Sequence, residues 1–388
     1  MKKYSQIILL VVFLCALFLN LKCKKDDGQC LTCPPPATNC EYPAGNRNFT
    51  WRIDTVAWWP STLGGLWAFS DNDAWVMGNM CGPTVPGQTN YMGLHWNGQR
   101  WDDTVKFLDI FIEPNDVIGD ASFMAAVGYR MMPEGTFSTI VEYDNKTKKW
   151  KTYQFQSFGE LRSVWTDGSG YFIAVGDNGM VYTKDGYLAD WVYQKASTDF
   201  NFTKVTGVSK TEIYTRAVQS LATGEYYDQI WKYLNNSWIK LMDNKDTTDM
   251  PIKIPEAGDE VYEIAACRCS ITDSLYLYIV GRESFEFTTK GNSLIFLKNN
   301  LAEKGLPSSQ EAAGFINLFS PNDYWVSGIR YQLYHWNSSN FQKIEPIPYL
   351  PYGQLWGVIS RIKRNNSGKI WMVLEMDSQI YAILQAVP

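Results

Sequence analysis

The stretch Leu66-Trp67-Ala68-Phe69-Ser70-Asp71-Asn72-Asp73-Ala74-Trp75-Val76-Met77-Gly78, continued by Leu94-His95-Trp96-Asn97-Gly98-Gln99-Arg100-Trp101, recurs along this chain of 388 residues. A second copy occupies residues 318–328 and 334–341. Each copy reads as an inner strand, a polar turn, a second strand ending at glycine, a third strand, a tight turn of Asn, Asp or Gly, and an outer strand opened by an aromatic residue. The repeat therefore predicts a sheet of four antiparallel strands.

The glycine that closes the second strand sets the period of the repeat. It recurs 47 to 50 residues apart, except for one interval of 105 residues that holds a weaker unit at 208–214; its positions are Gly78, Gly128, Gly176, Gly281 and Gly328. In the fifth unit, the outer strand is expected after Asn299-Asn300. A seventh unit, 355–384, ends before a fourth strand, and residues 49–54 resemble the outer strands, with Trp51 in the place of Trp101.

These units together predict an all-β fold over residues 49–388. The expected architecture is a seven-bladed β-propeller of four-stranded antiparallel blades, whose ring is closed by the N-terminal strand completing the last blade. Such closure removes a free sheet edge that would invite aggregation.

The first residues predict export. Lys2 and Lys3 precede an apolar run from Ile7 to Leu19, which is too short to cross a bilayer as a helix, so residues 1–22 are expected to be a signal peptide. Its removal leaves 32 basic against 40 acidic residues, since it takes three of the 35 lysines and arginines. The net charge then moves from −5 to −8, which argues against a nucleic-acid partner.

Residues 23–48 are polar, contain Pro34-Pro35-Pro36 and lack a hydrophobic period, so they are expected to form a tether. In an exported chain, cysteines favour disulfides over a zinc site, which would need a second Cys pair at matching spacing. The connectivity stays open among Cys30, Cys33, Cys40, Cys81, Cys267 and Cys269.

Three stretches resemble known families. Cys23-Lys24-Lys25-Asp26-Asp27 resembles the start of Bacteroidetes-type surface lipoproteins, although Lys22 stands where that family has a small residue. The resemblance implies a lipid on Cys23 and a place at the outer-membrane surface; the alternative is ordinary cleavage, giving a secreted or periplasmic protein. The repeats themselves resemble uncharacterised bacterial surface propellers. Residues 176–186 with Trp191 are similar to Asp-box repeats of sialidase-like and photosystem-assembly-factor propellers, where the box stabilises a turn.

Catalytic residues are hard to find in this sequence. The two histidines, His95 and His335, share one position of the repeat, which indicates a structural role. The acidic residues of the turns are expected to accept backbone N–H bonds: Asp71, Asp73, Asp120, Asp167, Asp273 and Asp323. No pattern indicates a metal or a cofactor, and the sequence favours a non-enzymatic protein.

Binding has the better physical case, because the inner strands of a propeller converge on a central channel with loops at its mouth. Trp67, Trp165 and Trp356 fall at matching inner-strand positions and are the candidates for ligand contact; alternatively, they pack between blades. The sequence thus predicts a non-enzymatic cell-surface propeller, a monomeric ring that presents one face to a protein or glycan partner. The alternative is a secreted carbohydrate-active enzyme resembling a glycoside hydrolase, with a carboxylate pair at the channel mouth.

Overall fold

Almost all regular structure in the chain is β-strand. The computed structural model describes residues 45–388 apart from 82–89, 103–111, 221–225, 244–260, 269–274, 282–283, 291–292, 299–314, 321, 328–331, 338–339, 345–356 and 377–379. Within these ranges, the single helical element is a 3-10 turn, η1 (Asp177–Gly179). No helix in the described part of the chain is long and apolar enough to cross a membrane.

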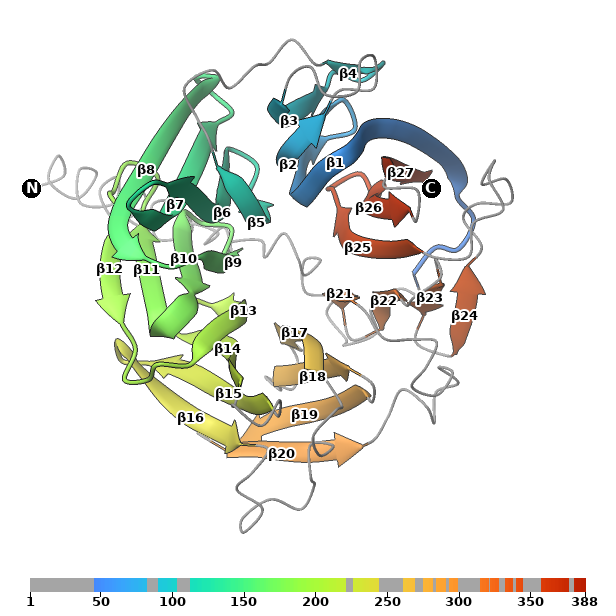
Figure 1. Cartoon of the computed structure of the whole chain (residues 1–388). Coiled ribbons are helices and arrows are strands. Elements are labelled where there is room, and N and C mark those ends of the chain that lie inside the picture. Colours follow the sequence, from blue (N-terminus) through green and yellow to red (C-terminus); the bar gives the residue numbers. More distant parts are fainter. Residues whose placement is uncertain are drawn as a thin grey trace, which may run out of the picture.

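The strands form antiparallel sheets in which neighbours in sequence pair with each other (Figure 1). Five sheets have four strands each and the sixth has seven. The four-stranded sheets are β5 (Glu113–Gly119), β6 (Phe123–Met132), β7 (Gly135–Asp144) and β8 (Lys149–Phe158); β9 (Leu161–Thr166), β10 (Tyr171–Gly176), β11 (Met180–Asp185) and β12 (Val192–Lys195); β13 (Asn201–Ser209), β14 (Glu212–Ser220), β15 (Tyr226–Leu234) and β16 (Ser237–Asp243); β17 (Val261–Arg268), β18 (Leu275–Gly281), β19 (Ser284–Lys290) and β20 (Ser293–Lys298); and β21 (Phe315–Ser320), β22 (Asp323–Ser327), β23 (Leu333–Trp336) and β24 (Phe341–Ile344).

The seven-stranded sheet joins the two ends of the described chain through one long strand, β1 (Thr50–Ser70). Its first half, Thr50 to Trp58, pairs with β27 (Ile380–Val387), and its second half pairs with β2 (Asp73–Cys81). The remaining strands of this sheet are β3 (Asn90–Trp96), β4 (Trp101–Asp102), β25 (Gly357–Arg364) and β26 (Ile370–Met376). The sheet thus contains two four-stranded sets that share β1, and the strand predicted from residues 49–54 lies beside β27.

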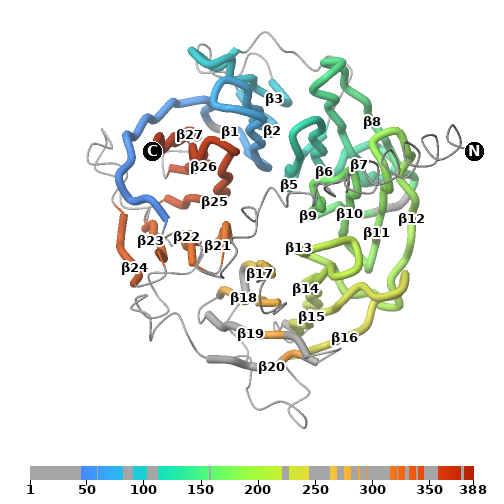
Figure 2. The backbone as a smooth tube through the Cα atoms, turned by 180° about the vertical axis from the view of Figure 1, so that it is seen from behind, coloured from blue at the N-terminus to red at the C-terminus, as the bar shows by residue number. Residues whose placement is uncertain are grey.

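The sheets stand side by side around a centre (Figures 1 and 2). The first strand of each four-stranded sheet is innermost, and in the seven-stranded sheet β25 and the second half of β1 take that place. Each inner strand contacts the next in chain order, from β1 through β5, β9, β13, β17, β21 and β25, and β25 contacts β1. Buried side chains fill the spaces between neighbouring sheets. The predicted all-β propeller of four-stranded antiparallel sheets is confirmed.

The repeated glycine has a specific steric cause. At Gly78, Gly128 and Gly176 an added Cβ would lie about 2 Å from a backbone carbonyl oxygen in the inner strand or directly before it, at 2.1, 1.9 and 2.1 Å. In each case the inner strand has a β-bulge at that point, which brings its carbonyl over the end of the second strand. Only a residue without a side chain fits beneath such a bulge.

One predicted strand is misplaced. The outer strand of the fifth sheet is β20, which ends at Lys298, before the Asn299-Asn300 pair that was expected to precede it. The prediction was wrong because outer strands were located by an aromatic residue at their start, whereas β20 begins at Ser293.

Most of the predicted N-terminal segments lie outside the described residues, including Cys23, Cys30, Cys33 and Cys40. From the last part of the predicted tether, Arg47 donates hydrogen bonds to the carbonyl oxygens of His335 (2.9 Å) and Asn340 (2.7 Å). The chain therefore contacts the sheet of β21–β24 before β1 begins. Cys81 and Cys267 are buried, and Cys269 lies outside the described residues.

Candidate functional site

The inner strands share one register, which can be read from the partner of each residue in the second strand. Trp67 lies opposite Trp75, Asn317 opposite Trp325 and Lys363 opposite Trp371. The three positions are therefore equivalent, although their side chains differ in size and polarity. The sequence placed Trp356 at this position of the last unit; it lies outside the described residues, and the register assigns the position to Lys363.

Trp67 and Trp165 both border the central channel but are almost completely buried, each with 4 % of its surface exposed. Each packs against a glycine of the next inner strand: Trp67 lies over Gly119, and Trp165 lies over Gly207. The indole nitrogen of Trp67 also donates to the carbonyl oxygen of Asp120, at 3.2 Å. Both side chains therefore fill the contact between neighbouring blades, and ligand contact by them stays a prediction.

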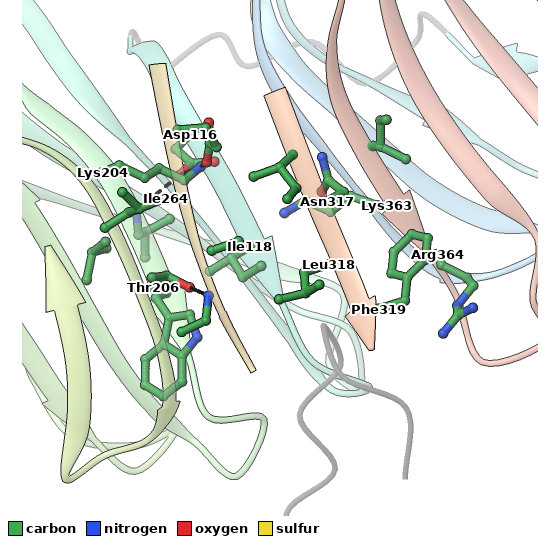
Figure 3. A pocket seen from close by; sticks show the side chains of 18 of the residues that line it. Asp116, Ile118, Lys204, Thr206, Ile264, Asn317, Leu318, Phe319, Lys363 and Arg364 are labelled. Atoms are coloured by element: carbon green, nitrogen blue, oxygen red, sulfur yellow. Dashed lines mark hydrogen bonds and ion pairs between the residues drawn. The ribbon is translucent and has the colours of Figure 1, made fainter. Parts of the chain in front are cut away.

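A cluster of charged side chains lies at the central channel, where Lys204 of β13 reaches toward Asp116 of β5 (Figure 3). Lys204 Nζ lies 2.7 Å from Glu263 Oε1 and 3.6 Å from Asp116 Oδ2. Asp116 Oδ2 also accepts from the hydroxyl of Ser163, at 2.7 Å. Arg361 donates to the carbonyl oxygen of Asn115, the neighbour of Asp116, at 3.0 Å and so joins β25 to β5. We call Asp116, Ser163, Lys204, Glu263 and Arg361 the channel cluster.

The charges of this cluster hold one another in their ionised forms. Burial would raise the pKa of Asp116, but the positive charges of Lys204, Arg361 and Lys363 outweigh it, so the pKa is lowered. Burial likewise acts to lower the pKa of Lys204, yet Asp116 and Glu263 raise it. The cluster is thus a compensated ionic network rather than a set of groups poised to exchange protons.

The two histidines belong to the turns of the repeat. The Nε2 atom of His95 is hydrogen-bonded to Asp73 Oδ1 at 2.9 Å, and that of His335 to Asp323 Oδ1 at 2.8 Å. Each imidazole also stacks on the tryptophan of the second strand, with ring centroids 4.5 Å and 4.3 Å apart. This is the structural role that their shared position in the repeat predicted.

The turn carboxylates divide into two groups. Asp120 and Asp167 accept backbone N–H bonds inside their turns, as expected. In the repeated Ser-x-Asn-Asp turn, however, the serine hydroxyls of Ser70 and Ser320 accept the backbone N–H bonds. The aspartates there accept side-chain donors instead, which corrects the expectation for Asp71, Asp73 and Asp323. Asp273 lies outside the described residues.

An aromatic groove lies on the outer side of the ring, between β8 and the sheet of β9–β12. It is lined by Phe155, Gln156, Tyr182, Trp191 and Tyr193. The rings are in contact, since the centroids of Phe155 and Tyr182 are 4.1 Å apart and those of Tyr182 and Tyr193 are 5.2 Å apart. We call these five residues the outer groove.

Apolar side chains are also exposed at the start of β12 and in the turn that precedes it. Tyr193 keeps 48 % of its surface exposed and Val192 keeps 58 %, while Leu188, in the turn before β12, is fully exposed. Tyr187 in the same turn is 38 % exposed. Half of the eight large hydrophobic side chains exposed in the described residues therefore lie within one stretch of seven residues.

A buried ion pair fixes the floor of the outer groove. Glu142 Oε1 accepts hydrogen bonds from Lys184 Nζ and from the indole nitrogen of Trp191, both at 2.7 Å. Burial raises the pKa of Glu142, and the positive charge of Lys184 opposes that rise. Because the indole is bonded on its buried side, the orientation of Trp191 is set before any ligand arrives.

The outer groove was not identified from the sequence. The signal was present in Trp191-Val192-Tyr193, an apolar run on an outer strand, where one face should be polar. Phe155 and Tyr182 belong to separate sheets, so their contact is set by the packing of one blade on the next.

No group of three or more His, Cys, Asp or Glu side chains that could hold a metal ion occurs in the ranges that the structure describes.

No protein-family model matches the sequence, and no curated protein matches it significantly. Solved β-propellers are similar in structure. The structure titled "YCF48 bound to D1 peptide" is 13 % identical, with a TM-score of 0.58, covering 89 % of this chain and 98 % of that one.

Two further solved structures have comparable similarity. The WD40 repeats of RRP9 are 10 % identical, with a TM-score of 0.56, over 89 % of this chain and 99 % of that one. YCF48 from Cyanidioschyzon merolae is 11 % identical, with a TM-score of 0.51, over 87 % and 98 %. At such low identity, the similarity establishes the propeller fold.

Proposed function

We propose that this protein is a non-enzymatic binding propeller that holds a segment of a protein partner in the outer groove. The observation that carries the proposal is the outer groove itself, an aromatic hollow in which Tyr193 keeps 48 % of its surface exposed. Exposed apolar surface around a hollow is typical of a site that a partner covers. The similar propeller YCF48 has been solved bound to a peptide, which supports a peptide segment as the ligand.

The geometry of the groove suits an extended chain. Both β8 and β12 are outer strands, each last in its sheet, so each offers backbone groups along one edge. A peptide strand can pair with such an edge while its side chains enter the aromatic pocket beside it. Aromatic rings also stack on sugars, so a glycan is the second ligand class to test.

The channel gives little support to a glycoside hydrolase. Its carboxylates, Asp116 and Glu263, both contact Lys204. A glycosidase needs one protonated carboxyl group to donate to the leaving oxygen. The charges around Asp116 lower its pKa and so act against that form. An ionic network that braces the inner strands accounts for these residues better than catalysis does.

The N-terminal segment supplies the proposed location. A lipid on Cys23 would attach the ring to the outer membrane through the tether of residues 24–48, leaving the ring at the cell surface. Labelling with a radioactive fatty acid tests this directly. Incorporation that is lost in Cys23→Ala supports the anchor, and equal labelling of both chains contradicts it.

The binding proposal is tested by presenting the purified protein with a displayed peptide library and a glycan array. Tyr193→Ser is compared with Ile53→Ser, a control that removes a 39 % exposed apolar side chain from β1 in another sheet. We expect a ligand whose affinity falls about tenfold or more in the Tyr193 variant only, as for a central aromatic contact. Ligands unaffected by Tyr193→Ser, or sugar released from any glycan, would contradict the proposal.

A further inference from the structure

Two polar side chains at equivalent inner-strand positions face the central channel without a partner. They are Asn317 of β21 and Lys363 of β25, which lie in the same register of adjacent sheets (Figure 3). Neither side chain forms a hydrogen bond or ion pair with another described residue, and both are partly exposed. An ammonium and an amide N–H group are thus available together.

The other cations near Lys363 each have an acceptor. Lys204 is compensated by Glu263 and Asp116, and Arg364 donates to Asp323 Oδ2 at 2.5 Å. Arg361 contacts no carboxylate among the described residues, but it donates to the carbonyl oxygens of Ser360 and Asn115. Four cations thus stand against three carboxylates among these residues, and Lys363 is the cation that has no acceptor.

The size of the cavity limits the ligand. Its volume is about 70 Å³, which is room for several water molecules, since about 10–15 Å³ on this measure holds one. A carboxylate group fits this volume. The two tryptophans at the same level, Trp67 and Trp165, are buried and offer no open face for stacking on a sugar.

We propose that the central channel binds one carboxylate group, which accepts hydrogen bonds from Lys363 Nζ and the Asn317 amide. The carboxylate belongs either to a free small acid or to the end of a peptide chain. This site is separate from the outer groove, and its test does not depend on the proposed function.

The site has a defined pH dependence. Burial, reinforced by Lys204 and Arg361, lowers the pKa of Lys363 to about 8, against the opposing effect of Asp116 and Glu263. These four are the charged groups that act on Lys363 from β5, β13, β17 and its own strand. Because the pKa of Asp116 is lowered and that of Lys204 is raised, neither changes charge between pH 6.5 and 9.5. The affinity for a carboxylate should therefore fall about 30-fold over this range, as Lys363 loses its proton.

The test uses the full-length chain in a non-ionic detergent, with acetate as the probe. Binding is followed by saturation-transfer NMR of the acetate methyl group at constant ionic strength. We expect a signal at pH 6.5 that weakens about 30-fold in affinity by pH 9.5 and is absent in Lys363→Met. Lys210→Met, which removes an exposed lysine that pairs with Asp185, is the matched control and should bind as the wild type does.

N-acetylglycine and N-acetylglycinamide distinguish the sources of the carboxylate. Binding of acetate and N-acetylglycine, but not of the amide, supports a peptide end as the ligand. Binding of acetate alone supports a free small acid. Acetate binding that persists in Lys363→Met or does not change with pH, or equal binding of the amide, would overturn the proposal. The pH series on the unmodified protein decides the question even if Lys363→Met does not fold.

Discussion

Replacing Lys204 with methionine removes the positive charge at the centre of the channel cluster while nearly preserving the length of the side chain. Lys204 lies between two carboxylates, Glu263 and Asp116, and 21 % of its side chain is exposed. The two carboxylates are less exposed still, at 7 % and 4 %. The substitution therefore leaves two negative charges that water solvates poorly.

The expected loss of stability follows from this burial. Removing one partner of a buried ion pair typically costs about 3–5 kcal/mol. A propeller of about 340 residues has an unfolding entropy near 0.7 kcal/mol/K at the usual ~2 cal/mol/K per residue, so the melting temperature should fall by roughly 4–7 °C.

The loss of stability caused by Lys204→Met should also depend on pH. The titration of Asp116 decides whether the loss grows or shrinks as the pH falls. In the unmodified protein the pKa of Asp116 is lowered, so its contribution to stability is present at neutral pH and is lost only as the pH falls through that lowered value. Without Lys204, the largest of the charges that oppose burial is gone and the pKa of Asp116 should rise. The variant then gains stability relative to the wild type when the pH is lowered from 7 to 5.

Calorimetry at pH 7 and pH 5 checks both statements. Lys210→Met is the control, since its pair with Asp185 is exposed and should contribute less than about 1 kcal/mol. The triple variant Lys204→Met, Asp116→Asn, Glu263→Gln should recover much of the loss, because it removes the uncompensated charges together. Equal destabilisation by both lysine variants, or a penalty at pH 5 as large as that at pH 7, would refute the reasoning.

Three further substitutions test the repeat itself. Gly128→Ala places a Cβ 1.9 Å from a carbonyl oxygen of the inner strand, so a loss of more than about 2 kcal/mol is expected in urea unfolding; an unchanged midpoint would show that the bulge yields freely. Asp323→Ala removes the acceptor shared by His335 and Arg364 and should cost about 2–4 kcal/mol. Asp73→Ala, at the more exposed equivalent turn, should cost about 1 kcal/mol. Equal losses in the two aspartate variants would contradict the role assigned to burial.

The repeat in the sequence was sufficient to predict the strands and their pairing, except for the outer strand of the fifth unit. Strand alternation, turn residues and glycine spacing are local features, and each unit of about 50 residues carries its own copy of them. The closing glycines were informative because a bulge in the same unit requires them. The structural role of His95 and His335 was predictable for the same reason, since their partners lie within their own units.

The candidate sites were decided by contacts between units. The channel cluster combines residues of β5, β9, β13, β17 and β25, and the outer groove combines residues of two adjacent sheets. Pattern alone also could not show that Lys363, rather than Trp356, shares the register of Trp67, because that register depends on strand pairing. The sequence by itself therefore determined the repeating sheet, whose interactions are local along the chain. Only the tertiary structure decided which side chains meet between blades, because each such contact depends on how one sheet packs against the next.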